Sequence, residues 1–171
     1  MSTLSVTTLQ GLASSPTPTK IEVASGHSLH APGHVIQVKQ ITTSTLVQID
    51  STSATATGLS LSITPSSVNS RILVMGNLNG VYTSAVNSSV NVDVFRGASS
   101  SDTKISDAQV HAAYDTASTD NQRNVPFCIL DAPSTTSAQT YSVFFNRNAG
   151  SGNVACQANS SQSSLTLMEI A

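Results

Sequence analysis

The chain has 171 residues and a mass of 17.6 kDa, the size of one domain and enough to bury a sizeable core. Charged residues make up only 9 %, against about 25 % in ordinary soluble proteins, and 30 serines and 20 threonines supply most of the polarity. Seven basic and nine acidic residues give a net charge of −2 without any Lys/Arg cluster, which excludes nucleic acid and anionic membranes as partners. The longest apolar runs are about five residues, so membrane insertion is excluded too.

Residues 1–34 differ in composition from the rest of the chain. They hold three of the six prolines, and their apolar residues are too scattered to form a core of their own. Residues 1–10 show no basic stretch followed by an apolar one, so we expect no secretory signal and synthesis in the cytoplasm. The segment is predicted to be extended and to lie along a partner or along other copies of the chain. Its apolar positions include Leu4, Val6, Leu9, Ile21 and Val23.

From residue 35 onward, short apolar runs alternate with clusters of Ser, Thr, Asn and Gly. The 45 Val, Ile and Thr residues favour strands, and the spacing of the runs is typical of an antiparallel β-sandwich, jelly-roll-like, over residues 35–171. Part of the stretch 106–114 could instead be a short helix. The predicted strands are 35–41, 45–50, 58–64, 71–76, 90–96, 106–112, 123–130, 140–146, 153–158 and 164–170.

Two patterns within these strands indicate how they pack. Residues 59–64 alternate strictly between aliphatic and hydroxyl side chains, which predicts a half-buried strand ending at Pro65. Residues 71–75, 127–130 and 165–170 are instead apolar on both faces. A strand with two apolar faces needs a cover on the outer side of a sandwich. Self-association would provide one; the alternative is that these are central strands capped by loops.

Catalytic and metal-binding patterns are missing from the sequence. It has no Gly-x-Ser-x-Gly elbow, phosphate loop or His-Glu-x-x-His motif, and we predict a non-enzymatic protein without a catalytic residue, cofactor or metal. His27, His30 and His34 could surround a metal on a threefold axis, but solvated histidines are favoured. Cys128 and Cys156 lie among apolar neighbours and are predicted to be free, buried thiols, with a bridge between strands as the alternative.

Three stretches carry a family resemblance. Residues 1–10 (MSTLSVTTLQ) with 21–38 resemble the start of many tail-fibre and appendage proteins of tailed bacteriophages, notably of cyanobacterial and aquatic hosts. Residues 58–74, with GLSLSITPSS followed by SRILV, resemble the central signature of that group, and 165–170 (LTLMEI) its ending. The similarity covers most of the chain and is weakest over residues 97–160.

The resemblance implies a homotrimeric virion fibre. Its N-terminal segment, including Leu4, Val6, Leu9, Ile21 and Val23, would dock on a baseplate, tail or neck protein of the phage, and its β head would meet a glycan or protein of the host surface. The chain departs from long fibres because it has almost no shaft, so a capsid, collar or tail decoration without receptor binding is the alternative.

The receptor contacts are predicted in polar segments that separate apolar strands. These are residues 77–89, 115–124 and 146–153, which are rich in Asn, Ser and Gly. The residues singled out in them are Asn79, Tyr82, Asp120, Arg123 and Asn148.

Overall fold

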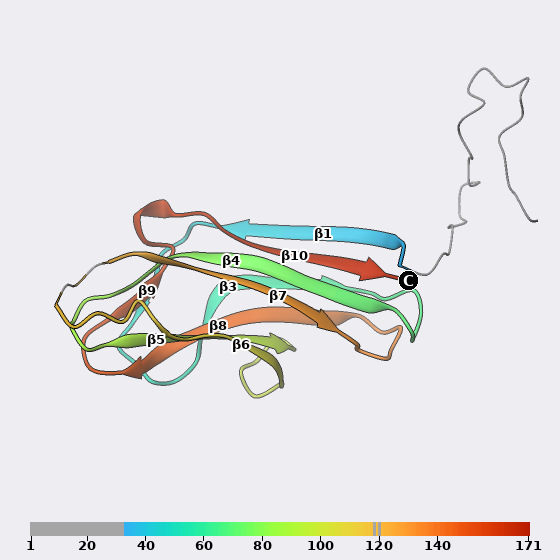
Figure 1. The fold of residues 1–171 in the computed structure, drawn as a ribbon. Coiled ribbons are helices and arrows are strands. Elements are labelled where there is room, and N and C mark those ends of the chain that lie inside the picture. The colour runs from blue at the N-terminus through green and yellow to red at the C-terminus, as the bar shows by residue number, and fades with distance from the viewer. Residues whose placement is uncertain (1–32, 118, 120) are drawn as a thin grey trace, which may run out of the picture. The chain divides into compact units, whose positions relative to one another are not determined.

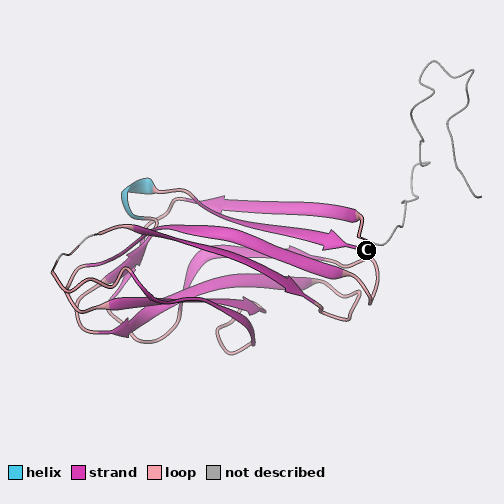
Figure 2. Ribbon diagram, viewed as in Figure 1, coloured by secondary structure: helices cyan, strands magenta, loops and turns pink. Residues whose placement is uncertain are grey.

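The computed structural model describes residues 33–117, 119 and 121–171, and all statements below concern these residues. Ten strands and a single short 3-10 turn, η1 (Ala158–Ser160), make up the regular structure (Figures 1 and 2). No helix in this part of the chain is long and apolar enough to cross a membrane. The strands are β1 (Val35–Thr43), β2 (Val47–Ile49), β3 (Thr55–Ile63), β4 (Arg71–Thr83), β5 (Ser89–Arg96), β6 (Thr103–Ala112), β7 (Arg123–Asp131), β8 (Gln139–Ala149), β9 (Val154–Cys156) and β10 (Ser163–Ile170).

Eight of these strands form two antiparallel sheets that pack face to face (Figure 1). In one sheet the order is β1-β10-β4-β7, and in the other it is β3-β8-β5-β6. This arrangement, in which successive strands of the sandwich pass from one sheet to the other except at the β5–β6 hairpin, is a jelly roll. The short strands β2 and β9 pair with each other, and β9 also pairs with the end of β4. The predicted antiparallel, jelly-roll-like sandwich is therefore confirmed.

Every predicted strand is present, but one of them is much longer than expected. The sequence predicts that β4 ends at residue 76, whereas the strand continues to Thr83. Asn77 and Asn79 disfavour a strand by propensity, yet Leu78 and Val81 are fully buried, and their burial outweighs this preference. A register shift between Leu78 and Val81 at Gly80, which has a φ of +62°, restores the inward side of the strand. The stretch 106–112 is strand, not helix.

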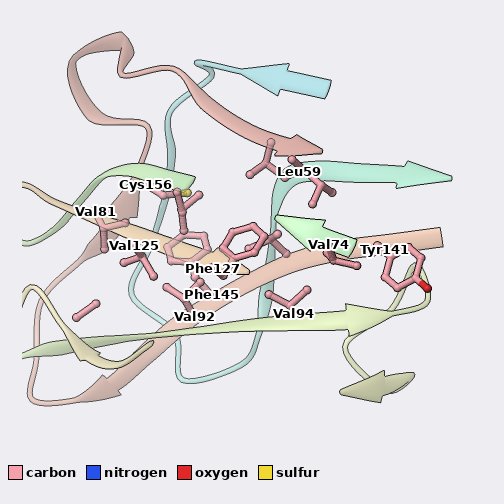
Figure 3. Close-up of a cluster of buried hydrophobic side chains, with 14 of the residues drawn as sticks. Leu59, Val74, Val81, Val92, Val94, Val125, Phe127, Tyr141, Phe145 and Cys156 are labelled. Carbon is pink, nitrogen blue, oxygen red and sulfur yellow. The ribbon is translucent and has the colours of Figure 1, made fainter. Parts of the chain in front are cut away.

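The core lies between the two sheets, and Figure 3 shows its central part. Leu59 and Ile63 point inward from β3 and are buried, whereas Ser60 and Ser62 between them are exposed, as the alternation predicts. The turn at Pro65 is also present, closed by a hydrogen bond from the Ser70 N–H to the Ser67 carbonyl. The largest fully buried side chains are those of Tyr141 and Phe145 on β8.

The links between strands lie at the two ends of the sandwich, and the described part of the chain begins and finishes at the same end. At one end, called the entry end here, the Gly33 N–H donates to the Ala171 carbonyl at 3.0 Å and the Ala171 N–H to His34 at 2.9 Å. The turns 64–70, 97–102 and 132–138 lie at this end, because the paired residues Ile63 and Gln139 mark it in the second sheet. The links 84–88, 113–122 and 150–153 lie at the opposite end, called the distal end.

Candidate functional site

The outer face of the sheet β1-β10-β4-β7 carries a line of apolar side chains. Val38 pairs with Met168, Met168 with Leu73, and Leu73 with Leu130. Directly paired residues project from the same face of an antiparallel sheet, so these four side chains form one row across four strands, about 14 Å wide. We call it the apolar row. Val38 and Leu130 are each 54 % exposed, so no described loop covers them.

The next row along the same face is uncharged. It consists of Gln40, Thr166, Met75 and Cys128, with a hydrogen bond of 2.9 Å from Gln40 Nε2 to Thr166 Oγ1. A shallow depression of about 460 Å³ lies over this row. Cys128 is a free thiol that is exposed here, which corrects the prediction that both cysteines are buried; Cys156 is free and buried as predicted. Cys128 is exposed because Phe127 and Ile129, its neighbours on β7, take the inward positions.

Three charged side chains among the described residues, Asp93, Lys104 and Asp107, form a cluster. On the outer face of the second sheet, Lys104 Nζ lies 3.1 Å from Asp93 Oδ1 and 2.8 Å from Asp107 Oδ1. Burial raises the pKa of Asp93, and the hydrogen bond from Lys104 lowers the pKa of Asp107. No group of three His, Cys, Asp or Glu side chains able to hold a metal occurs among the described residues.

A buried carboxylate at the entry end was missed by the sequence analysis. Glu169 is fully buried, and its Oε1 accepts hydrogen bonds from the Ser66 N–H, Ser66 Oγ and Ser70 Oγ at 2.6 to 2.7 Å. Gln37 Nε2 donates to Oε2 at 2.6 Å. Burial opposes ionisation, but these four donors outweigh it and lower the pKa of Glu169. Glu169 shares the inward parity of Leu165 and Leu167, which indicates its side of β10, but the sequence does not show that donors from distant segments meet it there.

The links at the distal end are joined into one surface by hydrogen bonds. The Asn87 N–H donates to the Asp115 carbonyl at 2.7 Å, which connects links 84–88 and 113–122. The Ser84 N–H donates to the Asn153 carbonyl at 2.9 Å, and the Ser151 N–H to Ser88 Oγ at 2.8 Å, which connect 84–88 with 150–153. The three segments predicted to carry receptor contacts therefore converge at the end opposite to Gly33.

The individual residues predicted in those segments are mostly on strands, which corrects their placement in loops. Asn79 and Tyr82 are on β4, Arg123 is the first residue of β7, and Asn148 is on β8. The strands extend into these polar segments because alternate residues there still face the core. Asp120, Leu4, Val6, Leu9, Ile21 and Val23 lie outside the described residues, as do His27 and His30.

Only part of this set comes together. The pairing of Val81 with Arg123 brings Asn79, Tyr82 and Arg123 into one region, whereas Asn148 lies on the other sheet. Asn79 has a structural role: its N–H donates to Ser163 Oγ, its Nδ2 to the Gln162 carbonyl at 2.6 Å, and its carbonyl accepts from the Gln157 N–H. Tyr82 is half-buried, and its hydroxyl donates to Gln48 Oε1 at 3.0 Å.

Beside Tyr82 lies a pocket of about 250 Å³. Its lining combines an aromatic ring, aliphatic groups and two amides, and comprises Leu46, Tyr82, Gln122, Ala158 and Asn159. Ala158 and Asn159 belong to a segment with an unusual backbone, since Gln157, Asn159 and Ser160 have φ values of +57°, +53° and +57°. Nothing in the sequence pattern marked this segment.

The search against protein-family models found no match, and neither did the search of curated proteins. Among solved structures, the VP2 subviral particle of infectious bursal disease virus is 13 % identical with a TM-score of 0.48; the match covers 87 % of this chain and 37 % of that one. A chain of the cyanophage Pam1 capsid asymmetric unit is 12 % identical with a TM-score of 0.33, over 86 % of this chain and 96 % of that one.

A third structure, reported under the heading CBM4 structure and function, is 11 % identical with a TM-score of 0.29, over 77 % and 92 % of the two chains. With TM-scores below 0.5, none of these likenesses carries weight for function. The chain spans little more than a third of the viral chains of VP2 that it matches. What the fold and the site define by themselves is a jelly-roll β-sandwich protein with an apolar row on one outer sheet face and a polar distal end.

Proposed function

We propose that the chain is a non-enzymatic structural protein of a tailed-phage virion, a short homotrimeric appendage. Residues 1–34 attach it to a baseplate, tail or neck protein, and the distal end of the jelly roll faces the host surface. The observation that carries the proposal is the apolar row, because none of the described residues covers Val38 and Leu130. Three copies and attachment to a phage follow from the sequence resemblance.

The energetics favour covering the row by another copy of the chain. Val38 and Leu130 are about half exposed, and completing the burial of such a side chain is worth roughly 1 kcal/mol. Each copy contributes both, so several kcal/mol are gained when copies associate. Neither the apolar row nor the row of Gln40, Thr166, Met75 and Cys128 contains a charged side chain, so a second copy meets no like charge in these two rows.

The polarity of the jelly roll supports the attachment part of the proposal. The chain enters at Gly33, next to its C-terminal residue, and the three connected polar links are at the other end. A protein held through its N-terminal segment would thus present links 84–88, 113–122 and 150–153 outward. Several copies on one particle turn weak contacts into firm attachment, so no deep site is required.

Sedimentation tests the association. We expect wild type to sediment at micromolar concentration as a complex of three chains and the variant Val38→Lys to sediment as a monomer, because a charge in the row must be desolvated. Val68→Lys is the matched control: Val68 is 55 % exposed but lies in the turn 64–70, outside the row. A monomeric wild type, or equal dissociation of both variants, would contradict the proposal.

Locating the protein on the particle tests its role. Antibodies against the purified chain should label the tail or baseplate in electron micrographs and reduce adsorption of the phage to its host. A second candidate, an architectural decoration protein, is favoured by the apolar row itself, which requires a neighbour but no receptor. Labelling of the capsid or collar without any effect on adsorption would replace the first function by the second.

A further inference from the structure

The geometry points to a binding site for a neutral saccharide in the pocket beside Tyr82, lined by Leu46, Gln122 and Asn159. This inference rests on the proposed function for its biological role, since it names the class of molecule that the distal end contacts. The binding itself stands on the chemistry of the lining.

The position of the Tyr82 ring is fixed by its neighbours. Tyr82 pairs with Ala155 on β9, and Ala155 pairs with Gln48 on β2, so the three residues form one line across short strands. The Tyr82 hydroxyl donates to Gln48 Oε1 across Ala155, which is fully buried. The hydrogen bond restrains the ring, and Leu46 beside it is 53 % exposed. The pocket therefore has a preformed apolar side.

The segment that contributes Ala158 and Asn159 to the pocket is held by buried hydrogen bonds as well as by packing. Gln157 is fully buried; its N–H donates to the Asn79 carbonyl at 2.9 Å and its Nε2 to the Thr57 carbonyl at 3.2 Å. Gly80 lies so close that a Cβ there would be 2.6 Å from the Ala158 nitrogen. These contacts maintain the positive φ values of Gln157, Asn159 and Ser160, a backbone form that costs on the order of 1 kcal/mol or more per residue.

The lining selects the class of ligand. None of the described residues that line the pocket is charged, so an ionic ligand would lose hydration there without gaining a counter-ion from them. Gln122 and Asn159 are exposed, and their amides offer hydrogen bonds that a polar ligand can use and a wholly apolar ligand cannot. A ring and an aliphatic side chain beside two amides, each both donor and acceptor, suit a molecule with one apolar face and several hydroxyls. Neutral pyranoses have this character.

The test is saturation-transfer NMR with methyl glycosides of glucose, galactose and N-acetylglucosamine, and with glucuronic acid as the charged probe. We expect wild type to transfer saturation to at least one neutral glycoside and not to glucuronic acid. Tyr82→Ala should weaken binding about tenfold or more. Tyr114→Ala is the matched control, since Tyr114 is 47 % exposed at the distal end but does not line the pocket, and it should bind like wild type.

A second variant separates binding from folding. Asn159→Gly removes the amide, while glycine adopts the φ of +53° without strain, so the wall is kept. We expect several-fold weaker binding of the same glycoside and an unchanged sedimentation coefficient. The inference is overturned if no neutral glycoside binds, if glucuronic acid binds as well, or if Tyr82→Ala and Asn159→Gly bind like wild type. Sedimentation and particle labelling report on the proposed function independently of these outcomes.

Discussion

At the scale of single residues, most positions follow the alternation of the sequence, and the exceptions are polar groups that face inward. Leu59 and Ile63 could be assigned to the core from their spacing alone. Glu169 could not, because an alternating pattern says which side a residue takes but not whether donors from distant segments meet it there. Ser66 and Ser70 come from the turn before β4, about a hundred positions earlier, and only the fold brings them to this carboxylate.

The variant Glu169→Gln should lose about 2–4 kcal/mol of unfolding free energy at pH 7, because the amide cannot accept all four hydrogen bonds in the buried site. The lowered pKa of Glu169 means that this stabilisation is complete above the unfolded value of about 4.3 and is lost as the pH falls through the folded pKa. Urea unfolding at pH 7 and pH 3 measures it. The difference from wild type should shrink at pH 3, and Asp50→Asn, an exposed control, should show neither effect. A deficit that is equal at both pH values would refute the account.

At the scale of elements, the strands were predictable and their lengths and connections were only partly so. Apolar runs identified all ten strands, but β4 continues for seven residues beyond its predicted end. It already pairs with a strand on each side, so one buried residue in every two or three is enough to keep it extended. The candidate receptor segments were therefore predicted as loops where the structure has the ends of strands, and their contact with a receptor stays a prediction. Which sheet each strand joins was not predictable from local pattern, since it depends on long-range pairing.

A hydrogen-bonded cluster links the two sheets at the entry end. Asp131 on β7 accepts from Tyr141 Oη on β8 at 2.7 Å and from Arg96 Nη1 on β5 at 3.0 Å, with Tyr141 fully buried. Burial and the adjacent Asp131 carboxylate raise the pKa of Tyr141, so the phenol keeps its proton and remains a donor. Tyr141→Phe should lower the unfolding free energy by about 1–2 kcal/mol. Urea unfolding measures the loss. Tyr114→Phe, at an exposed tyrosine, is the control and should change the unfolding free energy little. Equal losses in the two variants would show that the hydrogen bond from Tyr141 to Asp131 does not stabilise the fold.

At the scale of the whole molecule, composition predicted an unpartnered surface but could not place it. Two-sided apolar strands left open whether loops or other copies cover them. The structure removes the first option for Val38 and Leu130, because the described links lie at the ends of the sandwich and not over this sheet. Low charge then has a physical role, since the two rows of uncharged side chains are desolvated at little cost when copies meet.

The two cysteines give an internal measure of whether this face is covered in the assembled protein. Cys128 is exposed one row away from the apolar row, whereas Cys156 is buried and burial raises the pKa of its thiol to about 12. We expect a maleimide to modify Cys128 slowly in wild type at micromolar concentration and at least about tenfold faster in monomeric Val38→Lys, whose substitution lies three strands away. Cys156 should remain unmodified in both until urea is added. Fast modification of Cys128 in a wild type that sediments as an oligomer would show that copies associate through another surface, since a thiol beneath a packed interface reacts only when the interface opens.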